Sequence, residues 1–235
     1  MEKHPIWQYD ESKHAGVNYA DESVAKQYNS RHTQFRNYEK EAAKIIDVLG
    51  LGNDSVVLDM GCGSGGLSVN FAKHCRKVYA VDVSPGMVEQ CKAKAGEYGL
   101  SNIETTCAGF LTYEHSGEVP DAIISTTVLH HLPDFWKQVA LRRMHGILKP
   151  GGKLFLSDVV FDFPVDQYET SIDGWLDAIE KMGGKSMKEE SVIHVKEEFS
   201  TWGWVMERML EIAEFRLDHR KSIMANMHAY ICSKQ

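Results

Sequence analysis

The strongest restriction on the fold comes from residues 56–66, which read VVLDMGCGSGG. The first three residues are apolar and mostly β-branched, which is typical of a buried parallel strand. Glycines then recur at every second position, and apolar side chains at helical spacing follow over residues 67–72. A strand, a glycine-rich turn and a helix in this order begin a doubly wound α/β domain that binds a nucleotide-like ligand, because the sharp turn exposes bare backbone to that ligand.

The rest of the chain up to residue 160 alternates between strand and helix patterns. Further strands are expected over residues 77–83, 102–107, 121–127 and 153–160. Further helices are expected over residues 86–98 and 135–144. This alternation predicts an α/β fold with a mostly parallel sheet. Beyond residue 160 the pattern predicts three helices and then two short strands, over residues 166–182, 186–194, 197–212, 214–217 and 228–233.

A helical stripe also precedes the glycine-rich stretch. Asp21 is a good helix cap, apolar side chains keep helical spacing after it, and the helix should end at Gly50 or Gly52. Arg36 falls within this stripe and either pairs with a ligand carboxylate or stands on a solvated helix face. The aromatic-rich residues 1–20 either pack on the surface or form a lid over a ligand.

Composition narrows the classes of partner. The 235 residues suffice for one α/β domain with additions, and the net charge of −7 gives no basic footprint for nucleic acid. The five cysteines are scattered and form no C-x-x-C pair, which is typical of reduced thiols and not of a disulfide frame or zinc site. The beginning of the chain has no apolar signal core, and no apolar run has membrane-spanning length. We therefore expect a cytoplasmic protein without a nucleic-acid or membrane partner.

Two side chains near the second strand have the character of ligand-binding groups. Asp82 ends that strand, 17 positions beyond Gly65, where an acid usually binds a pair of ribose hydroxyls. The alternative is that it caps the helix that follows. Met87 is placed either to flank an adenine ring or to fill the core. Because the loop glycines also fit a dinucleotide fingerprint, the loop alone leaves a nicotinamide dehydrogenase open.

The motifs taken together resemble a known family. Residues 57–65, VLDMGCGSG, resemble motif I of the class I S-adenosylmethionine-dependent methyltransferases, and Asp82 looks like their ribose-binding acid. Residues 128–132, VLHHL, and 148–152, LKPGG, are similar to the next two landmarks in the family order. The likeness covers about residues 40–160 and is closest to the small-molecule methyltransferases of ubiquinone and menaquinone biosynthesis. This set displaces the dehydrogenase interpretation, which gives no reason for the last two motifs.

The resemblance implies a Rossmann-like α/β fold of seven strands, mostly parallel with the last antiparallel, and helices on both faces. It implies one domain, with an N-terminal lid and helix, a cofactor-binding core, and a helical insert with a C-terminal hairpin, over residues 1–50, 51–160 and 161–235. The implied cofactor is S-adenosyl-L-methionine, which leaves as S-adenosyl-L-homocysteine, and no metal is implied. The expected cofactor-binding residues are Asp59, Gly61, Cys62, Gly63, Ser64, Gly65, Asp82, Val83, Met87, Gly109, Phe110 and Thr126.

The resemblance also implies roles for some of these residues. The loop glycines pass close to the methionyl part of the cofactor, Asp82 binds both ribose hydroxyls, and Asp59 holds the loop and the cofactor amino group. One position departs from the family pattern. Members often carry an acid after the third strand that hydrogen-bonds the adenine amino group, but residues 108–110 read AGF. Backbone groups of Gly109 and Phe110 could still reach the ring.

Methyl transfer from a sulfonium mainly requires that the protein align the acceptor and exclude water, so a base is not obligatory. If the acceptor must lose a proton, His130 and His131 are candidates because histidine titrates near neutrality, although the family usually uses this pair structurally. Asp158, at the carboxyl end of a strand, is a third candidate. An apolar acceptor pocket could be walled by aromatic side chains, which could equally be core, namely Trp7, Tyr9, Tyr19, Phe163 and Trp175.

The acceptor class is narrowed by motifs that the sequence lacks. No Asn/Asp-Pro-Pro-Tyr/Phe motif follows the fourth strand and no Pro-Cys pair occurs, which argues against methylation of nucleobases, as does the acidic charge. A small-molecule acceptor is therefore expected. An RNA or protein methyltransferase, or a protein that binds S-adenosylmethionine without transferring its methyl group, remain as alternatives. The chain could act as a monomer or a homodimer.

Overall fold

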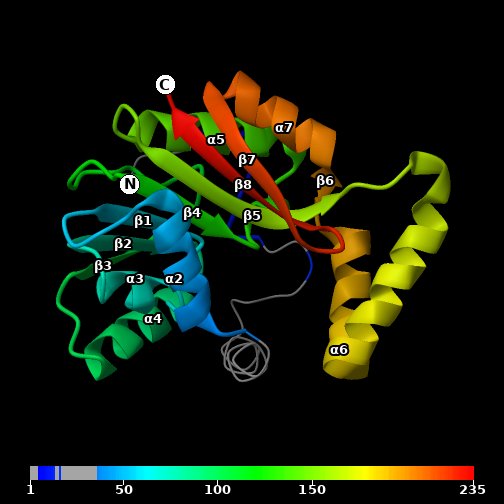
Figure 1. Cartoon of the computed structure of the whole chain (residues 1–235), viewed down its shortest axis with the longest axis horizontal. Helices are drawn as coiled ribbons and strands as arrows, with labels where there is room; N and C mark the ends of the chain where they lie inside the picture. The colour runs from blue at the N-terminus through cyan, green and yellow to red at the C-terminus, as the bar shows by residue number, and fades with distance from the viewer. Residues whose placement is uncertain (1–4, 14–15, 17–35) are drawn as a thin grey trace.

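A computed structural model describes residues 5–13, 16 and 36–235 of the chain (Figure 1). Its centre is a mixed sheet in which seven strands follow the order β3-β2-β1-β4-β5-β8-β7. The strands are β1 (Val56–Met60), β2 (Lys77–Asp82), β3 (Ile103–Cys107), β4 (Ala122–Thr126), β5 (Lys153–Phe161), β6 (Thr201–Trp202), β7 (Phe215–Met224) and β8 (Met227–Lys234). The first five pair in parallel, and β8 runs antiparallel to both β5 and β7. The predicted fold class is confirmed.

Helices cover both faces of the sheet. They are α2 (Tyr38–Leu49), α3 (Ser68–Ala72), α4 (Pro85–Glu97), α5 (Asp134–Ile147), α6 (Tyr168–Glu197) and α7 (Gly203–Ile212), with short 3₁₀ turns η1 (Leu129–His131) and η2 (Val165–Gln167). Figure 1 shows α5 and α7 on one side of the sheet and α2, α3 and α4 on the other.

Strand β1 explains why both faces are covered. All its residues are buried, and its apolar side chains divide between two hydrophobic clusters. Val56, Leu58 and Met60 pack with α5 and α7, while Val57 packs with α2 and α3. A continuous apolar strand of this kind is stable only when helices lie on both sides of it.

The N-terminal helix is shorter in the described residues than the pattern predicted. Its predicted first part falls in residues 17–35, which lie outside the described residues, as does Tyr19. The described helix α2 begins after Asn37, whose side chain accepts a hydrogen bond from the Lys40 N–H, and ends at Gly50 with φ of 66°. Arg36 therefore precedes the helix, and its predicted place within the helix was wrong.

The segment after β5 contains the bent helix that the pattern predicted. Helical limbs on either side of Gly183-Gly184 were expected, and α6 does bend at Gly184, where φ is 80°. Figure 1 shows the two limbs of α6 standing off the end of the sheet, and Lys188 on the second limb forms ion pairs with Asp177 and Glu180 on the first.

The helix predicted over residues 197–212 was partly wrong. Residues 201–202 form strand β6, which pairs in parallel with β5 off the main sheet order, and α7 starts only at Gly203. The backbone is extended at Glu198, and the next N–H, of Phe199, donates to the His130 carbonyl, so this stretch is tied to η1 and cannot be helical. Among the described residues, no helix has the length and hydrophobicity that crossing a membrane requires.

Candidate functional site

A cleft opens at the carboxyl ends of β1, β2 and β4. The strand order reverses between β1 and β4, and ligands of open α/β sheets bind at such a switch point. Every predicted cofactor residue except Gly65 lines this cleft. Of the three candidate bases, His131 lines it, whereas His130 and Asp158 do not.

The loop between β1 and α3 is tied to the end of β2. The N–H groups of Gly61 and Cys62 both donate to the Val81 carbonyl, at 2.8 and 2.9 Å. Gly61 has φ of 76°, and a Cβ built on it would lie 2.5 Å from the Val128 side chain. Only glycine is tolerated at such a position, since both the backbone angle and the space exclude other residues.

Gly65 has a packing role in the same loop. Its φ is 79°, and a Cβ there would lie 2.5 Å from Sγ of Cys91 on α4. The family resemblance implied that this glycine lies beside the cofactor, but it does not line the cleft. Its position lets the loop pack closely against α4.

Asp82 connects the end of β2 to the loop. Its Oδ2 accepts a hydrogen bond from the Gly63 N–H at 2.8 Å, and its Oδ1 accepts one from the Ser84 N–H at 2.9 Å. The helix α4 is capped by Ser84, whose Oγ accepts from the Met87 N–H at 3.4 Å. The cap of α4 is therefore Ser84 and not Asp82. The Asp82 carboxylate lines the cleft at the end of β2.

Asp59, in β1, is the second carboxyl group of the cleft. It is buried, and the Ser68 hydroxyl donates to its Oδ2 at 2.5 Å. Burial raises the pKa of Asp59 to about 7, because the charged form loses hydration that one hydrogen bond does not replace. A cationic group in the cleft would reverse this shift and favour the carboxylate.

Arg36 also lines the cleft, so the alternative of a solvated helix face was wrong. Its guanidinium donates twice to Glu41, at 2.6 Å for each bond, and once to Oγ1 of Thr126 at 3.2 Å. These bonds leave the guanidinium fixed at the wall of the cleft. A fixed guanidinium is well suited to bind a ligand carboxylate.

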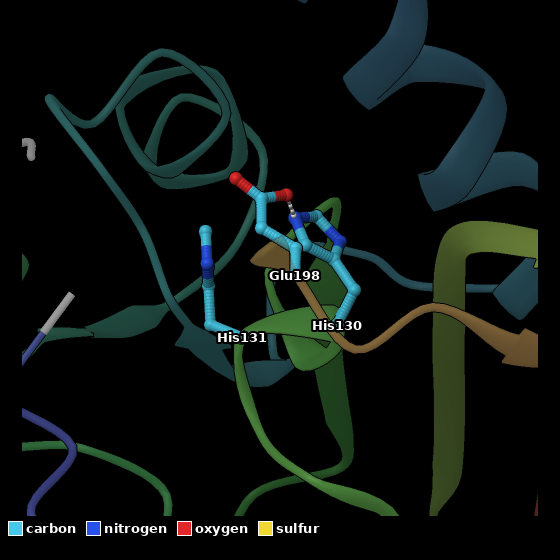
Figure 2. Close-up of side chains that lie close together, drawn as sticks. All are labelled: His130, His131 and Glu198. Atoms are coloured by element: carbon cyan, nitrogen blue, oxygen red, sulfur yellow. Dashed lines mark ion pairs between the residues drawn. The ribbon is translucent and has the colours of Figure 1, made fainter. Parts of the chain in front are cut away.

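A cluster of histidines and acids lies beside the cleft (Figure 2). The ring of His130, in η1, is held by Asp158 through an Nδ1–Oδ1 contact of 2.5 Å, and its Nε2 lies 3.3 Å from Oε2 of Glu198. Glu198 also forms an ion pair with His194 in the last turn of α6. Burial disfavours the charged form of His130, but the Asp158 and Glu198 carboxylates outweigh it and raise its pKa.

His131 has the opposite electrostatic character. Burial, followed by the neighbouring His130 charge, lowers the pKa of His131 to about 3, so its ring is neutral near pH 7. Together His130, His131 and Glu198 bring one ligand atom each within 4.8 Å of one another, a set that could hold a metal ion. The sequence implied no metal, and it does not reveal this set because Glu198 lies far from the histidines in the chain. The ion pairs of Glu198 with His130 and His194 already compensate its buried charge.

The predicted aromatic residues lie elsewhere. Trp7 stacks on Trp136 of α5 with ring centroids 6.3 Å apart, and Tyr9 lies 6.4 Å from the same ring. Phe163 packs against Trp202, and Trp175, on α6, is buried in a cluster with Val159 of β5. None of these predicted aromatic side chains lines the cleft. Tyr9, Phe163 and Trp175 pack against other side chains, whereas Trp7 is 72% exposed and is not a core residue.

Comparison with known proteins supports the interpretation of this cleft. Residues 57–152 match the family model described as "Methyltransferase domain". An uncharacterised methyltransferase of Geobacillus kaustophilus is 30% identical over 141 residues, which are 60% of this chain and 62% of that protein. A ubiquinone biosynthesis O-methyltransferase of Coxiella burnetii is 35% identical over 112 residues, 48% of this chain and 47% of that protein. The matches thus span about half to three fifths of these curated relatives.

Solved structures share the fold over most of the chain. A SAM-dependent methyltransferase from Aquifex aeolicus has a TM-score of 0.65 at 20% identity, covering 92% of this chain and 99% of that one. Magnesium protoporphyrin IX methyltransferase from Synechocystis, with bound SAH, has a TM-score of 0.67 at 15% identity, covering 93% and 97%. The order of the motifs, the strand order and the domain match agree, and residues 57–152 of this chain are therefore identified as a methyltransferase domain.

Proposed function

We propose that this chain is an S-adenosylmethionine-dependent methyltransferase that moves a methyl group to a small-molecule acceptor by in-line displacement. The observation that carries the proposal is the pair of carboxyl groups, Asp59 and Asp82, on either side of a rigid glycine loop at the switch point of the sheet. This arrangement suits a ligand that carries both a ribose diol and an ammonium group.

The side chains of the cleft fit the chemical groups of this cofactor. Asp82 offers acceptors for the ribose hydroxyls, Asp59 offers a carboxylate for the ammonium, and Arg36 offers a cation for the cofactor carboxylate. Backbone of the glycine loop would lie along the methionyl part, and Met87, Val83 and Phe110 give apolar surface for the adenine. The residues proposed to hold the cofactor are Arg36, Asp59, Gly61, Cys62, Gly63, Ser64, Asp82, Val83, Met87, Gly109, Phe110 and Thr126.

When bound, the cofactor supplies an electrophilic methyl group and a neutral thioether leaving group. The chain then has to orient the acceptor and keep water away. We assign the orienting role to His131, because it lines the cleft and its neutral ring accepts a hydrogen bond from an acceptor hydroxyl. A ring with so low a pKa is a weak base. His130 and Asp158 act as positioning residues behind it, since the rings of His130 and His131 lie 4.4 Å apart.

Charge and likeness both favour a small acceptor. The net charge of −7 disfavours binding to the negatively charged backbone of RNA. The name of the Coxiella relative refers to ubiquinone biosynthesis, and the name of the Synechocystis neighbour refers to magnesium protoporphyrin IX. Ubiquinone and magnesium protoporphyrin IX are both small molecules.

The test is a label-transfer experiment with three classes of acceptor. The protein is incubated with S-adenosylmethionine carrying a radioactive methyl group and with a cell extract divided into small-molecule, RNA and protein fractions. We expect label only in the small-molecule fraction. Label in RNA or protein would replace the proposed acceptor class, and tight binding of the cofactor with no label in any fraction would identify a binding protein without transferase activity.

Cofactor binding should depend on pH through Asp59. Its pKa of about 7 in the free protein means that the ammonium-binding carboxylate must first lose a proton. Lowering the pH from 7 to 6 should therefore weaken S-adenosylhomocysteine binding about fivefold, with release of a proton on binding. Calorimetric titrations in two buffers of different ionisation enthalpy measure both quantities. Asp59→Asn should remove this pH dependence, and a wild-type affinity that is equal at pH 6 and pH 7 would contradict the assignment.

A further inference from the structure

The turn after β3 lacks the acid that family members often use for adenine, but a carboxylate reaches this turn from the beginning of the chain. A Cβ built on Gly109 would lie 2.4 to 2.5 Å from the carboxyl carbon and both oxygens of Glu11. The Glu11 carboxyl group therefore occupies the space that a side chain at position 109 would fill. Glu11 and Gly109 both line the cleft.

The orientation of this carboxyl group is fixed by hydrogen bonds to one of its oxygens. Oε1 of Glu11 accepts from the Leu111 N–H at 2.9 Å and from the Thr112 hydroxyl at 3.0 Å. The Thr112 hydroxyl is itself fixed, because it accepts a bond from the Gly109 N–H at 2.8 Å. Two donors thus converge on Oε1 and determine which way the other oxygen faces.

The other oxygen, Oε2, is buried and has no hydrogen-bond partner among the described residues. A buried carboxylate oxygen without a donor is unfavourable, and burial accordingly raises the pKa of Glu11. A ligand with an N–H donor at this point of the cleft would remove the penalty. Met87 and Phe110, which also line the cleft, provide apolar surface for a flat ring beside that donor.

We propose that Glu11 supplies the carboxylate that accepts a hydrogen bond from the adenine amino group of the cofactor. The inference rests on the proposed function, because it concerns the same cofactor. It makes the N-terminal segment part of the cofactor site and explains how the site selects adenine although residues 108–110 contain no acid. A base that carries a carbonyl oxygen in place of the amino group would face Oε2 with another acceptor and be rejected.

The substitution Glu11→Gln gives a sharp test. The two donors to Oε1 require the amide oxygen at that position, so the amide NH₂ takes the place of Oε2 and turns an acceptor into a donor. We expect S-adenosylhomocysteine to bind the variant at least about tenfold more weakly than the wild type. S-inosylhomocysteine, in which a carbonyl replaces the amino group, should bind the variant more tightly than the wild type. Both affinities are measured by calorimetric titration.

Asp10→Asn is the matched control, because it removes the same charge from the neighbouring, exposed residue. Both affinities should stay within about twofold of the wild-type values in this variant. Gly109→Ala is a second probe, since its methyl group must displace the Glu11 carboxyl group, and it should weaken S-adenosylhomocysteine binding without favouring the inosine analogue.

The outcomes separate this inference from the proposed function. If folded Glu11→Gln binds S-adenosylhomocysteine as tightly as the wild type, the role of Glu11 is wrong while the cofactor assignment stands. If Glu11→Gln does not fold, an undiminished affinity of Gly109→Ala overturns the inference in the same way. If the wild-type protein binds neither nucleoside ligand, the proposed function itself fails.

Discussion

Replacement of Asp82 by alanine is expected to weaken S-adenosylhomocysteine binding by about 3 kcal/mol, and in any case by more than 1 kcal/mol. The variant loses the acceptor for two charge-assisted hydrogen bonds from the ribose, each of which contributes about 1.5 kcal/mol or more. It also frees the Gly63 N–H, which the carboxylate holds at 2.8 Å, so the glycine loop loses a fixed point. Calorimetric titration measures the change, and a thermal melt establishes that the variant is folded.

Two control variants separate the contributions of this carboxylate. Ser84→Ala removes the cap of α4, so it should lower stability by about 1 kcal/mol and leave the affinity nearly unchanged. Asp82→Asn keeps one oxygen acceptor and should fall between the wild type and Asp82→Ala. Unchanged affinity in a folded Asp82→Ala variant would refute the ribose-binding role.

Gly61→Ala should be the most destabilising single substitution in the loop, by about 3 kcal/mol. The left-handed backbone conformation contributes about 1 kcal/mol of this for a residue with a Cβ. The remainder comes from overlap, since the new methyl group would lie 2.5 Å from the Val128 side chain. The loop must shift to relieve this overlap, so cofactor affinity should fall as well. Urea unfolding gives the loss of stability.

Gly99 offers a matched control for the backbone contribution. Its φ is 64°, and a Cβ built on it would meet no atom within 4 Å. Gly99→Ala should therefore cost only about 1 kcal/mol. The double variant Gly61→Ala/Val128→Ala should recover part of the loss at Gly61. An equal loss of stability in Gly61→Ala and Gly99→Ala would show that Val128 does not restrict the loop.

The elements that could be predicted from the sequence depend on short-range patterns. Strand β1, its glycine turn and Asp82 lie within 27 consecutive positions from 56 to 82, and each has a local physical reason for its residue types. The pair at residues 130–131 was also found. The different positions of the two rings could not be predicted, because they depend on the 3₁₀ turn. This turn directs His131 toward the cleft and His130 toward Asp158.

The residues that the sequence missed reach the cleft, or the histidine cluster beside it, through tertiary packing. Glu11 enters from the N-terminal segment, where Tyr9 packs against Trp136 and the Gln8 side chain donates to the Leu111 carbonyl at 3.4 Å. Glu198, just after α6, reaches His130 in the histidine cluster beside the cleft. No periodicity or spacing encodes such contacts. For Glu11 one indirect signal existed, namely the missing acid at residues 108–110, which leaves room for a carboxylate from another segment.

The hydrogen bonds that the glycine loop donates to the end of β2 also determine when the loop becomes ordered. Because the N–H groups of Gly61 and Cys62 are bonded to the Val81 carbonyl, the loss of conformational entropy in this loop accompanies folding of the central strands and not ligand binding. Binding and folding are therefore linked: a cofactor at a hundred times its dissociation constant stabilises the native state by about 2.7 kcal/mol. The small population of unfolded chains should therefore fall about a hundredfold at that concentration of the cofactor.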